Sequence, residues 1–374
     1  MPAVLIVAAI AAVIGTAPTH HPSRGHILLT SPESTTSMTA TPASTTSTST
    51  SSTSTSTSSS TTSVVTPPAA LPQVSGTSTQ TSPGPLVYYP GAPADLKPLA
   101  GGSYYGEGHW VPAGRWVGSG PAVWATTLRP PAGGNPVGIA QLDTARLSVV
   151  PFAGTTQPGG TWTNQGEISP DRQPSLVAAF NGGFQFNSSE GGFYADGHAQ
   201  PPLRDGSASL VEFLDGSATV GQWGRDFSMS PYIASVRQNL QLLVDGGSVV
   251  PSAGNWTQWG ATLSHSASTW RSGVGSDDQS HLYYVGGPGL SPADLGTVLA
   301  SAGASRAMEL DINPQWVIFA SYTDGPGSPP STYGAKLLAS MYYSPEHFFS
   351  PDWRDFVGVF VRQGSPKPPP SGAH

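Results

Sequence analysis

Residues 281–311 read HLYYVGGPGLSPADLGTVLASAGASRAMELD, and this stretch contains the one helix that the sequence signals strongly. Ser291 is a good N-cap, Pro292 suits the first helical position, and Asp294 is favourable at the positive helix N-terminus. Gly303 provides a stop signal after the last turn. The apolar residues between these signals fall on one helix face, at Leu295, Val298, Leu299 and Ala302. The pattern predicts a helix from Pro292 to Ala302.

Two short apolar runs flank this helix, at 282–285 and 307–311. A short continuous apolar run is typical of a buried strand. The order strand, helix, strand predicts two parallel strands in one sheet, because a crossover helix carries the chain back to the edge where the first strand began.

Further apolar and alternating runs predict a β-rich domain around this unit. The other expected strands lie at 122–128, 138–142, 146–152, 175–180, 192–195, 209–214, 218–223, 240–245, 317–322 and 356–362. Asp215-Gly216 predicts a hairpin turn, and a second helix is expected around 334–342. Residues 88–120 are interpreted as an irregular lead-in. Many strands with few helices predict an α+β fold with a mixed β-sheet core.

The composition indicates that only part of the 374-residue chain folds. Every residue from 44 to 63 is Ser or Thr, and Ser, Thr, Pro and Ala dominate 31–83. Such a segment buries too little apolar area to offset the entropy of ordering it, which predicts a disordered stalk. A single large domain is expected over 85–365, followed by a disordered tail at 366–374.

Residues 3–15 form an apolar stretch that is shorter than the roughly 20 residues of a spanning helix. Small residues follow it, as in a signal peptide, although no Lys or Arg precedes it. Residues 1–20 are therefore interpreted as a signal peptide or a short membrane anchor. Either reading predicts a secreted or membrane-anchored extracellular protein, and the N-terminal segment is a candidate tether to a membrane or cell wall.

The composition also excludes several classes of function. The chain lacks cysteine, which removes disulfides and thiolate metal sites. Its net charge is −7 and it has no basic run, which argues against nucleic-acid binding. Abundant Trp and Tyr with few charges favour an extracellular protein that handles sugars. The histidines lack metal-ligand spacing, so neither a metal site nor a cofactor is expected, while calcium binding through loop carboxylates stays open.

Four apolar runs stop at polar residues or glycine pairs. These ends are Asn181-Gly182-Gly183, Asp245-Gly246-Gly247, Gly286-Gly287 and Asp311-Ile312-Asn313. Glycine lets the backbone turn sharply and lets a ligand approach it closely. Buried strands that end in this way indicate the rim of an active site, with ordinary turns as the alternative.

The stretch Ala-Phe-Asn-Gly-Gly-Phe at 179–184 resembles the Asn-Gly-Gly-Phe signature of the phosphodiester glycosidase family, which is named for the uncovering enzyme. Further blocks in the family's order lie at 242–247, 270–275 and 289–295, the last followed by Leu-Asp at 310–311. The chain is similar to a bacterial branch of this family over most of the predicted domain. The resemblance implies an exported hydrolase that cleaves a glycosyl-1-phosphodiester bond on a cell-envelope or extracellular glycan.

One block departs from the family pattern. The family continues Leu-Asp with Gly-Gly-Gly-Ser-Ser, whereas Asp311 is followed here by Ile-Asn-Pro-Gln-Trp. A glycine loop whose N–H groups can wrap a phosphate is thus replaced by a bulkier turn, and Pro314 removes one donor. This departure favours the alternative hypothesis, a non-catalytic envelope or glycan-binding protein on the same scaffold.

The implied reaction assigns roles to the rim residues. A sugar phosphodiester hydrolase must stabilise an oxocarbenium-like centre and a departing phosphate. Arg271 suits the phosphate through its bidentate guanidinium, and Asp311 is expected nearest the anomeric carbon. Asn181, with the backbone of Gly182 and Gly183, would position sugar hydroxyls or a phosphate oxygen. Each side chain also has a structural alternative, as an ion-pair partner, a turn brace or a turn former.

Glu309 is the natural second carboxylate if its side chain points into the cleft. Additional candidates for substrate binding are Asp245, Gln238, Asn313 and His198, the last as a proton carrier. The two hypotheses differ in geometry. A hydrolase requires Asp311 and a second acid within roughly 5–10 Å of each other across an open cleft that Arg271 also faces.

Overall fold

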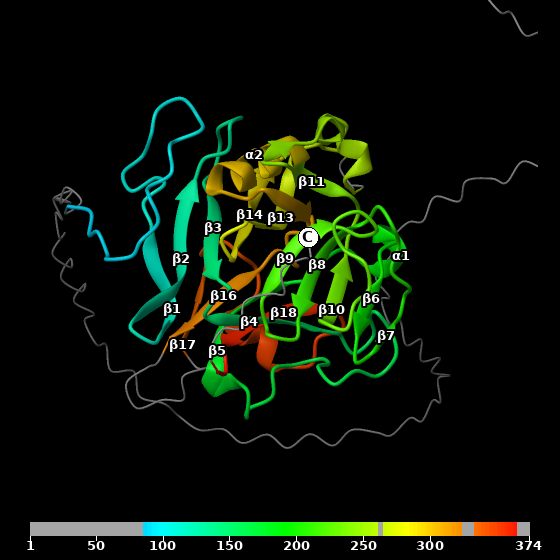
Figure 1. The fold of residues 1–374 in the computed structure, drawn as a ribbon. Helices are drawn as coiled ribbons and strands as arrows, with labels where there is room; N and C mark the ends of the chain where they lie inside the picture. The colour runs from blue at the N-terminus through cyan, green and yellow to red at the C-terminus, as the bar shows by residue number, and fades with distance from the viewer. Residues whose placement is uncertain (1–84, 261–264, 324–332, 365–374) are drawn as a thin grey trace, which may run out of the picture. The chain divides into compact units, whose positions relative to one another are not determined.

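A computed structural model describes residues 85–260, 265–323 and 333–364 (Figure 1). The predicted N-terminal segment, stalk and tail lie outside these residues. All the described residues belong to one compact unit. No helix in these three ranges is long and apolar enough to cross a membrane.

Helix α2 is Pro292–Ala302, with the bounds that the sequence predicts. The Ser291 hydroxyl accepts a hydrogen bond from the Asp294 amide, and the Asp294 carboxylate accepts one from the Ser291 amide. This capping box satisfies two donors at the helix start. Gly303 follows at φ 120°, a conformation that favours glycine, and the helix stops there.

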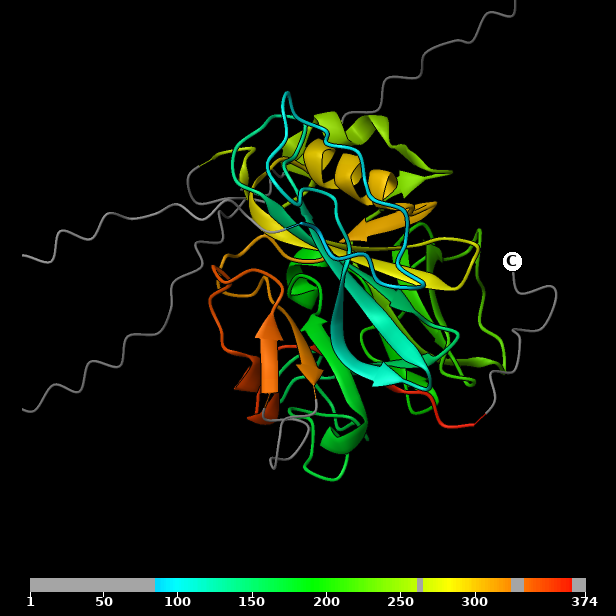
Figure 2. The same ribbon diagram turned by 90° about the vertical axis from the view of Figure 1, so that its left-hand side faces the viewer.

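Strands β14 (His281–Leu290) and β15 (Arg306–Glu309) flank α2 in the chain and lie in one sheet. They are not neighbours, because β13 (Thr269–Ser276) lies between them and pairs antiparallel with each. The two flanking strands therefore run parallel, as predicted. Helix α2 packs across these strands on one face of the sheet (Figure 2).

The largest sheet in the described residues has eight strands. Their order is β1 (Val111–Val117), β2 (Gly120–Leu128), β3 (Val137–Asp143), β14, β13, β15, β11 (Leu242–Asp245) and β12 (Ser248–Val249).

Two further sheets have five strands each. One has the order β7 (His198–Ala199), β6 (Phe193–Ala195), β10 (Ile233–Gln238), β8 (Ala208–Phe213) and β9 (Ala218–Gln222). The other has the order β17 (Tyr333–Lys336), β16 (Phe319–Thr323), β5 (Leu176–Asn181), β18 (Phe356–Val361) and β4 (Leu147–Phe152).

The expectation of a mixed β-sheet core is wrong. Every pairing between the described strands is antiparallel. The sequence pattern detected the strand–helix–strand unit but not β13, which separates its strands. Because β13 reverses direction between them, the parallel pair makes no direct ladder.

Several local predictions also differ from the structure. Residues 334–342 do not form a helix, because the segment from Tyr333 to Lys336 pairs with β16 as an edge strand. The expected irregular lead-in includes a regular strand, β1. The hairpin turn at Asp215-Gly216 is confirmed between β8 and β9. The remaining short helices are α1 (Phe186–Ser189) and the 3₁₀ turns Gln173–Ser175, Pro251–Gly254, Trp256–Gln258 and Pro345–Phe349.

The main hydrophobic core joins all three sheets. It contains Tyr284 and Met308 from the eight-stranded sheet, Phe180 and Val359 from the β5 sheet, and Leu210 from the β8 sheet. A second core fills the space between the opposite face of the eight-stranded sheet and α2. The sheets are therefore held against one another by apolar packing, and their ends provide fixed positions for polar residues.

Candidate functional site

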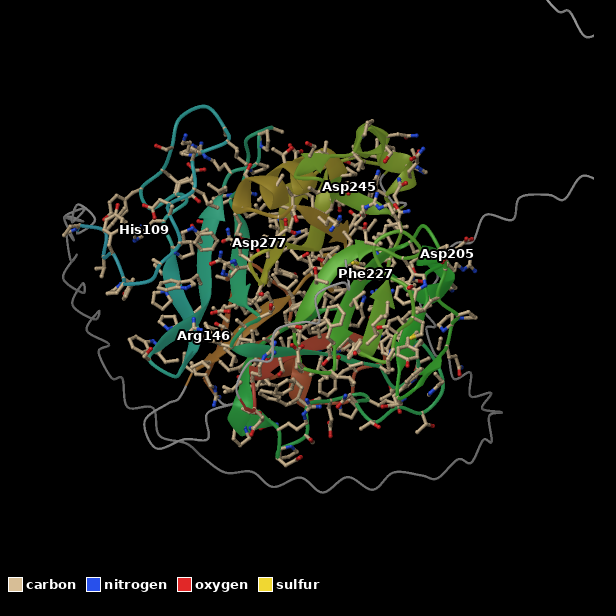
Figure 3. All side chains as sticks on the ribbon, viewed as in Figure 1. His109, Arg146, Asp205, Phe227, Asp245 and Asp277 are labelled. Carbon is tan, nitrogen blue, oxygen red and sulfur yellow. The ribbon has the colours of Figure 1, made fainter. Side chains whose placement is uncertain are left out.

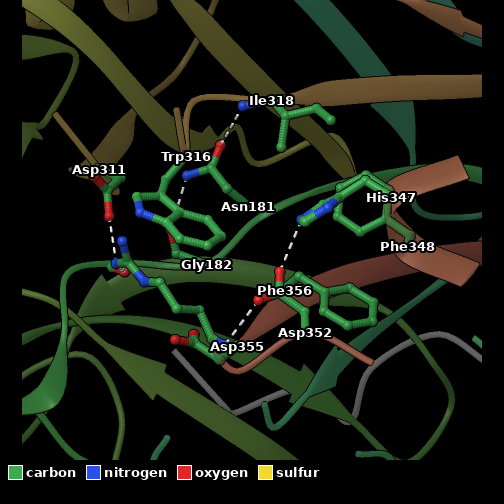
Figure 4. Close-up of a pocket in the computed structure, with 12 residues that line it drawn as sticks. Asn181, Gly182, Asp311, Trp316, Ile318, His347, Phe348, Asp352, Asp355 and Phe356 are labelled. Carbon is green, nitrogen blue, oxygen red and sulfur yellow. Dashed lines mark hydrogen bonds and ion pairs between the residues drawn. The ribbon is translucent and has the colours of Figure 1, made fainter. Parts of the chain in front are cut away.

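A pocket forms where strand ends from different sheets meet. Strand β5 ends at Asn181, opposite Phe356, where the antiparallel strand β18 begins. Asp311 follows β15 by two residues. Together with neighbouring loops they surround about 250 Å³ of non-atom space, open solvent included, with a cavity volume of about 10 Å³, which is room for about one water molecule. The residues that line it are Asn181, Gly182, Gly183, Asp311, Trp316, Ile318, His347, Phe348, Asp352, Arg354, Asp355 and Phe356 (Figure 4).

Asn181 is 6% exposed, and its side-chain amide is fully engaged. The amide nitrogen donates to the Gly182 carbonyl (2.8 Å) and to the Ser272 hydroxyl (3.0 Å). The amide oxygen accepts from the Tyr284 hydroxyl (2.8 Å) and the Ile318 amide (3.1 Å). Asn181 thus ties β5 to β13 and β14, and it uses its whole hydrogen-bonding capacity within the protein.

Asp311 forms an ion pair with Arg354 inside this pocket (Figure 4). Its other oxygen accepts from the Asn313 amide at 2.8 Å, and its own amide donates to the Ser272 hydroxyl at 3.2 Å. Burial raises the pKa of Asp311, an effect that the Arg354 charge and the turn amides partly offset. Ser272 therefore links Asp311 to Asn181 through one hydroxyl.

Arg354 is the cation of the pocket, and the sequence analysis missed it. The Nη2 atom that contacts Asp311 also donates to the Gly183 carbonyl at 2.7 Å. The guanidinium lies over the Trp316 ring, with 5.0 Å between its central carbon and the ring centroid. Stacking of this kind fixes an arginine's orientation while leaving its edge free for an anion.

Gly182 and Gly183 are required by close packing. A Cβ at Gly182 would lie 2.1 Å from the Asp355 carboxylate, and one at Gly183 would lie 2.9 Å from the Asn239 side chain. Asp355 is held in place by a buried two-point ion pair with Arg237, at 2.7 and 3.2 Å. The glycine pair thus lets the loop after β5 sit directly against two buried polar groups.

A histidine–carboxylate pair completes the pocket wall. His347 Nε2 lies 2.8 Å from the Asp352 carboxylate, and the Asp352 side chain also accepts from the Arg354 amide. The imidazole stacks on Tyr343 with 4.0 Å between ring centroids. An imidazole oriented by a carboxylate can carry a proton in either direction. Neither residue was singled out in the sequence.

Arg271 and Glu309 do not line this pocket. Both are fully buried, and Arg271 Nη1 lies 2.5 Å from Glu309 Oε1. The remaining Arg271 contacts are backbone carbonyls of Leu290, Trp259 and Ala267. Burial raises the pKa of Glu309 to about 7, despite the adjacent arginine. The arginine predicted to bind phosphate is therefore enclosed by protein acceptors, and the expectation that it faces an open cleft together with Asp311 does not hold.

Gln238 and Asn313 both bond to backbone groups near them in the fold. The Gln238 side chain is fully buried and bonds the backbone of Gly192 and Arg204 as well as the Ser209 hydroxyl. Asn313 is exposed in the turn after Asp311, where its side chain accepts from the Gln315 amide. Neither side chain lines the pocket.

Asp245 and His198 lie away from the pocket. Asp245, labelled in Figure 3, ends β11 and forms a two-point ion pair with Arg225 at 2.7 and 3.0 Å. His198 is exposed and stacks on Trp162, with 4.3 Å between ring centroids. Of the predicted site residues, the structure therefore brings together Asn181, Gly182, Gly183 and Asp311.

Carboxylate and imidazole groups in the described residues form no cluster of three or more that could hold a metal ion. The pocket's polar side chains are instead paired within the protein, some with one another and some, such as Asp355 with Arg237, with groups outside the lining. The charged and titratable groups of its lining are Arg354, the buried carboxyl of Asp311 beside it, the His347–Asp352 pair, and Asp355, which Arg237 holds.

Comparison with known proteins gave structural likenesses of low similarity. No protein-family model matches the chain, and no curated protein does. The zebrafish N-acetylglucosamine-1-phosphodiester alpha-N-acetylglucosaminidase catalytic domain, auto-inhibited by its pro-peptide, is 16% identical with a TM-score of 0.41, over 67% of this chain and 87% of that one. A Synechocystis protein is 14% identical with a TM-score of 0.36, over 64% and 62%. Likenesses at this level carry no argument about function, and family membership stays a prediction.

Proposed function

We propose that this protein is a hydrolase that cleaves a glycosyl-1-phosphodiester bond in the pocket at the end of β5. The observation that carries the proposal is the convergence of Asp311, Arg354 and the His347–Asp352 pair on one small space. These are the group types that such a reaction needs: a carboxyl, a cation for the phosphate and a proton carrier. We further propose that the substrate is a cell-envelope or extracellular glycan.

Arg354 takes the role that the sequence analysis gave to Arg271. It would bind the phosphodiester through the guanidinium edge not used by Asp311, while Trp316 supports its face. Phosphate binding would draw Arg354 away from Asp311 and leave this carboxyl beside the anomeric carbon. The bond from the anomeric carbon to the phosphate oxygen then breaks, water supplies the new hydroxyl, and the phosphate leaves as a monoester.

The His347–Asp352 pair would accept the proton of the attacking water. Asp352 fixes the imidazole from one side, and stacking on Tyr343 fixes its plane. Asn181 would act through position rather than contact, because all its polar atoms are bonded within the protein. Its link to Ser272 holds the backbone on which Asp311 is carried.

Turnover of a panel of glycosyl-1-phosphodiesters by the purified chain tests this proposal. Asp311→Asn and His347→Gln are each expected to lower kcat at least 100-fold, the range that general acid–base groups contribute. Arg354→Lys keeps the charge but loses the planar fork, so we expect mainly a higher KM. Arg225→Gln, in an exposed ion pair outside the pocket, is the matched control and should retain activity. Equal turnover by wild type and Asp311→Asn would refute the assignment.

A second candidate function is glycan binding without catalysis. It is favoured by the closed hydrogen-bonding of Asn181 and by the pairing of both Asp311 oxygens, which leave few polar atoms free for a substrate. The same panel separates the two. Saturable binding of a phosphodiester that Arg354→Lys weakens, with no product released by the wild type, would establish binding alone.

A further inference from the structure

A second, larger pocket lies between the β8 sheet and strand β4, with a volume of about 1050 Å³, open solvent included. Its floor comes from Glu212 on β8 and Ser235 on β10, and its walls include Tyr194, Asp196, Asn164 and Arg172. It shares no lining residue with the pocket at the end of β5.

Glu212 is a buried carboxyl with one oxygen still available. The residue is 8% exposed, and the Ser235 hydroxyl donates to Oε2 at 2.6 Å. No donor in the described residues serves Oε1, and this oxygen is not among the sealed polar atoms, so it contacts the open space of the pocket. A buried carboxyl with one oxygen that lacks a hydrogen-bond donor destabilises the folded protein. Such a group indicates a ligand-binding site.

The protonation state of Glu212 defines what it can recognise. Burial raises its pKa to about 8, an effect that Ser235 and Arg172 only partly offset. At neutral pH the carboxyl is therefore mainly uncharged, and it can both donate and accept a hydrogen bond. A hydroxyl group has the same dual capacity and is its natural partner.

Arg172 is held rigidly at the side of this pocket. Its guanidinium carbon lies 4.2 Å from the Phe360 ring centroid and 5.0 Å from that of Phe152. Nη1 donates to the Asn164 side-chain oxygen, which turns the Asn164 amide nitrogen into a fixed donor. Two aromatic rings and one amide thus place several donors at defined positions, and the guanidinium also interacts electrostatically with Glu212 and Asp171.

The charges around the pocket favour a neutral ligand. Arg172 contributes one positive charge and Asp196 one negative charge, while Glu212 is mainly uncharged at neutral pH. A phosphate would meet Asp196, and a metal cation would find no cluster of three ligating side chains in the described residues. The pocket thus has hydrogen-bond donors and acceptors with a net charge near zero, and the Tyr194 ring lies beside them. This combination suits a ligand with several hydroxyl groups.

We propose that this pocket binds a neutral saccharide, with Glu212, Arg172 and Asn164 bonding its hydroxyls and Tyr194 covering an apolar sugar face. This site is separate from the one in which hydrolysis is proposed, and it does not depend on that proposal. A protein with both sites would hold a glycan chain at one position and act at another.

Saturation-transfer NMR and calorimetry on the full chain test this site, with maltose, cellobiose, chitobiose and trehalose as probes near neutral pH. At least one probe is expected to bind the wild type. Glu212→Met keeps the side-chain length and removes the polar group, and we expect at least tenfold weaker binding with an equal or higher melting temperature. Asn164→Ala, on a loop, is expected to weaken binding while leaving the fold intact.

Two controls place the bound sugar. Glu190→Gln removes an exposed carboxylate outside both pockets and should leave binding unchanged. Asp311→Asn should also leave binding unchanged, whether or not the protein is a hydrolase. The proposal is overturned if no probe binds the wild type, if binding survives Glu212→Met, or if Asp311→Asn abolishes it. Binding of inorganic phosphate or Ca²⁺ at Glu212 without binding of any sugar would likewise overturn it.

Discussion

Two buried arginines show how the neighbouring groups, rather than burial itself, decide the role of a charged side chain. Arg271 has no exposed surface and is surrounded by Glu309 and backbone carbonyls. Arg354 is also buried, but it lines the pocket and stacks on a tryptophan. A sequence motif can identify an important arginine. Only the surrounding acceptors show whether this arginine binds a ligand or forms a structural ion pair.

Replacing Arg271 should therefore affect stability before activity. Arg271→Ala leaves Glu309 as an unpaired buried carboxyl, so we expect unfolding in urea to require about 3–5 kcal/mol less free energy than in the wild type. The double variant Arg271→Met with Glu309→Met removes both charges and should recover most of this loss. A single variant of wild-type stability that has lost phosphodiester hydrolysis would instead make Arg271 a substrate ligand.

Glu212 should give the protein a measurable pH dependence of stability. Its pKa rises from 4.5 to about 8 on folding, so between these values the folded state keeps a proton that the unfolded chain releases. The free energy of unfolding therefore falls as pH rises through this window, by on the order of 5 kcal/mol in total.

Urea unfolding of wild type and Glu212→Gln at a series of pH values measures this effect. The amide cannot titrate, so the difference in stability between the two proteins should change in the variant's favour as pH rises. Folding raises the pKa of Glu309 in both proteins. Its contribution to the pH dependence of stability therefore cancels in the comparison. A difference that stays constant from pH 4.5 to 8 would contradict the assignment.

At the scale of elements, local signals predicted what local interactions determine. Helix α2 was predicted with its true bounds because its cap, first turn and stop are adjacent in the chain. Strand β13 was missed because its polar and glycine residues are stabilised by distant partners, such as Glu309 for Arg271. Residues 334–342 have helix-like spacing, yet pairing with β16 makes Tyr333–Lys336 a strand. Tertiary pairing overrides weak propensity in such segments.

Part of the candidate site was predicted and part was missed, because a local sequence pattern does not show which distant segments meet. Searching the carboxyl ends of apolar runs identified Asn181 and Asp311, which do line one pocket. In antiparallel sheets, however, the start of one strand lies beside the end of its neighbour. Arg354 and Asp355 directly precede β18, whose first residue pairs with Asn181. A search of strand beginnings as well as strand ends would have included both.

The loop between β5 and α1 should tolerate no side chain at Gly182. Gly182→Ala would bring a Cβ to 2.1 Å from the Asp355 carboxylate and disturb its pair with Arg237. We expect a loss of about 1–3 kcal/mol in unfolding free energy, typical of overpacking. Gly101→Ala is the matched control, because its Cβ would meet no atom within 4 Å. Equal stability of the two variants would show that this loop is not packed as described.

At the scale of the whole molecule, two hydrophobic cores hold the described domain together. The main core joins residues of all three sheets, from Val117 to Val359, and the second core adds α2 and the segment before β1. The pocket at the end of β5 likewise takes every lining residue from within these limits. We expect stability and chemistry to reside in this domain, because the composition of residues 31–83 predicts a disordered stalk.

Deletion of residues 31–83 tests this expectation. Because the composition of residues 31–83 predicts a disordered stalk that buries little apolar area, the shortened chain should have the melting temperature of the full chain and the same kcat on any phosphodiester that the full chain cleaves. Calorimetry and steady-state kinetics on both proteins give the comparison. A lower melting temperature in the shortened chain would show that the stalk packs on the domain.

The turn that replaces the expected glycine loop places Trp316 against the guanidinium of Arg354. An indole beside a cation emits light with an intensity and wavelength that depend on that contact. Any anion that draws the arginine toward itself would alter the fluorescence of Trp316, and of Trp353, whose ring centroid lies 5.7 Å from the same guanidinium. The residue that makes the loop unusual thus serves as a built-in optical probe of occupancy, readable without labelling and with a smaller signal expected in Trp316→Phe.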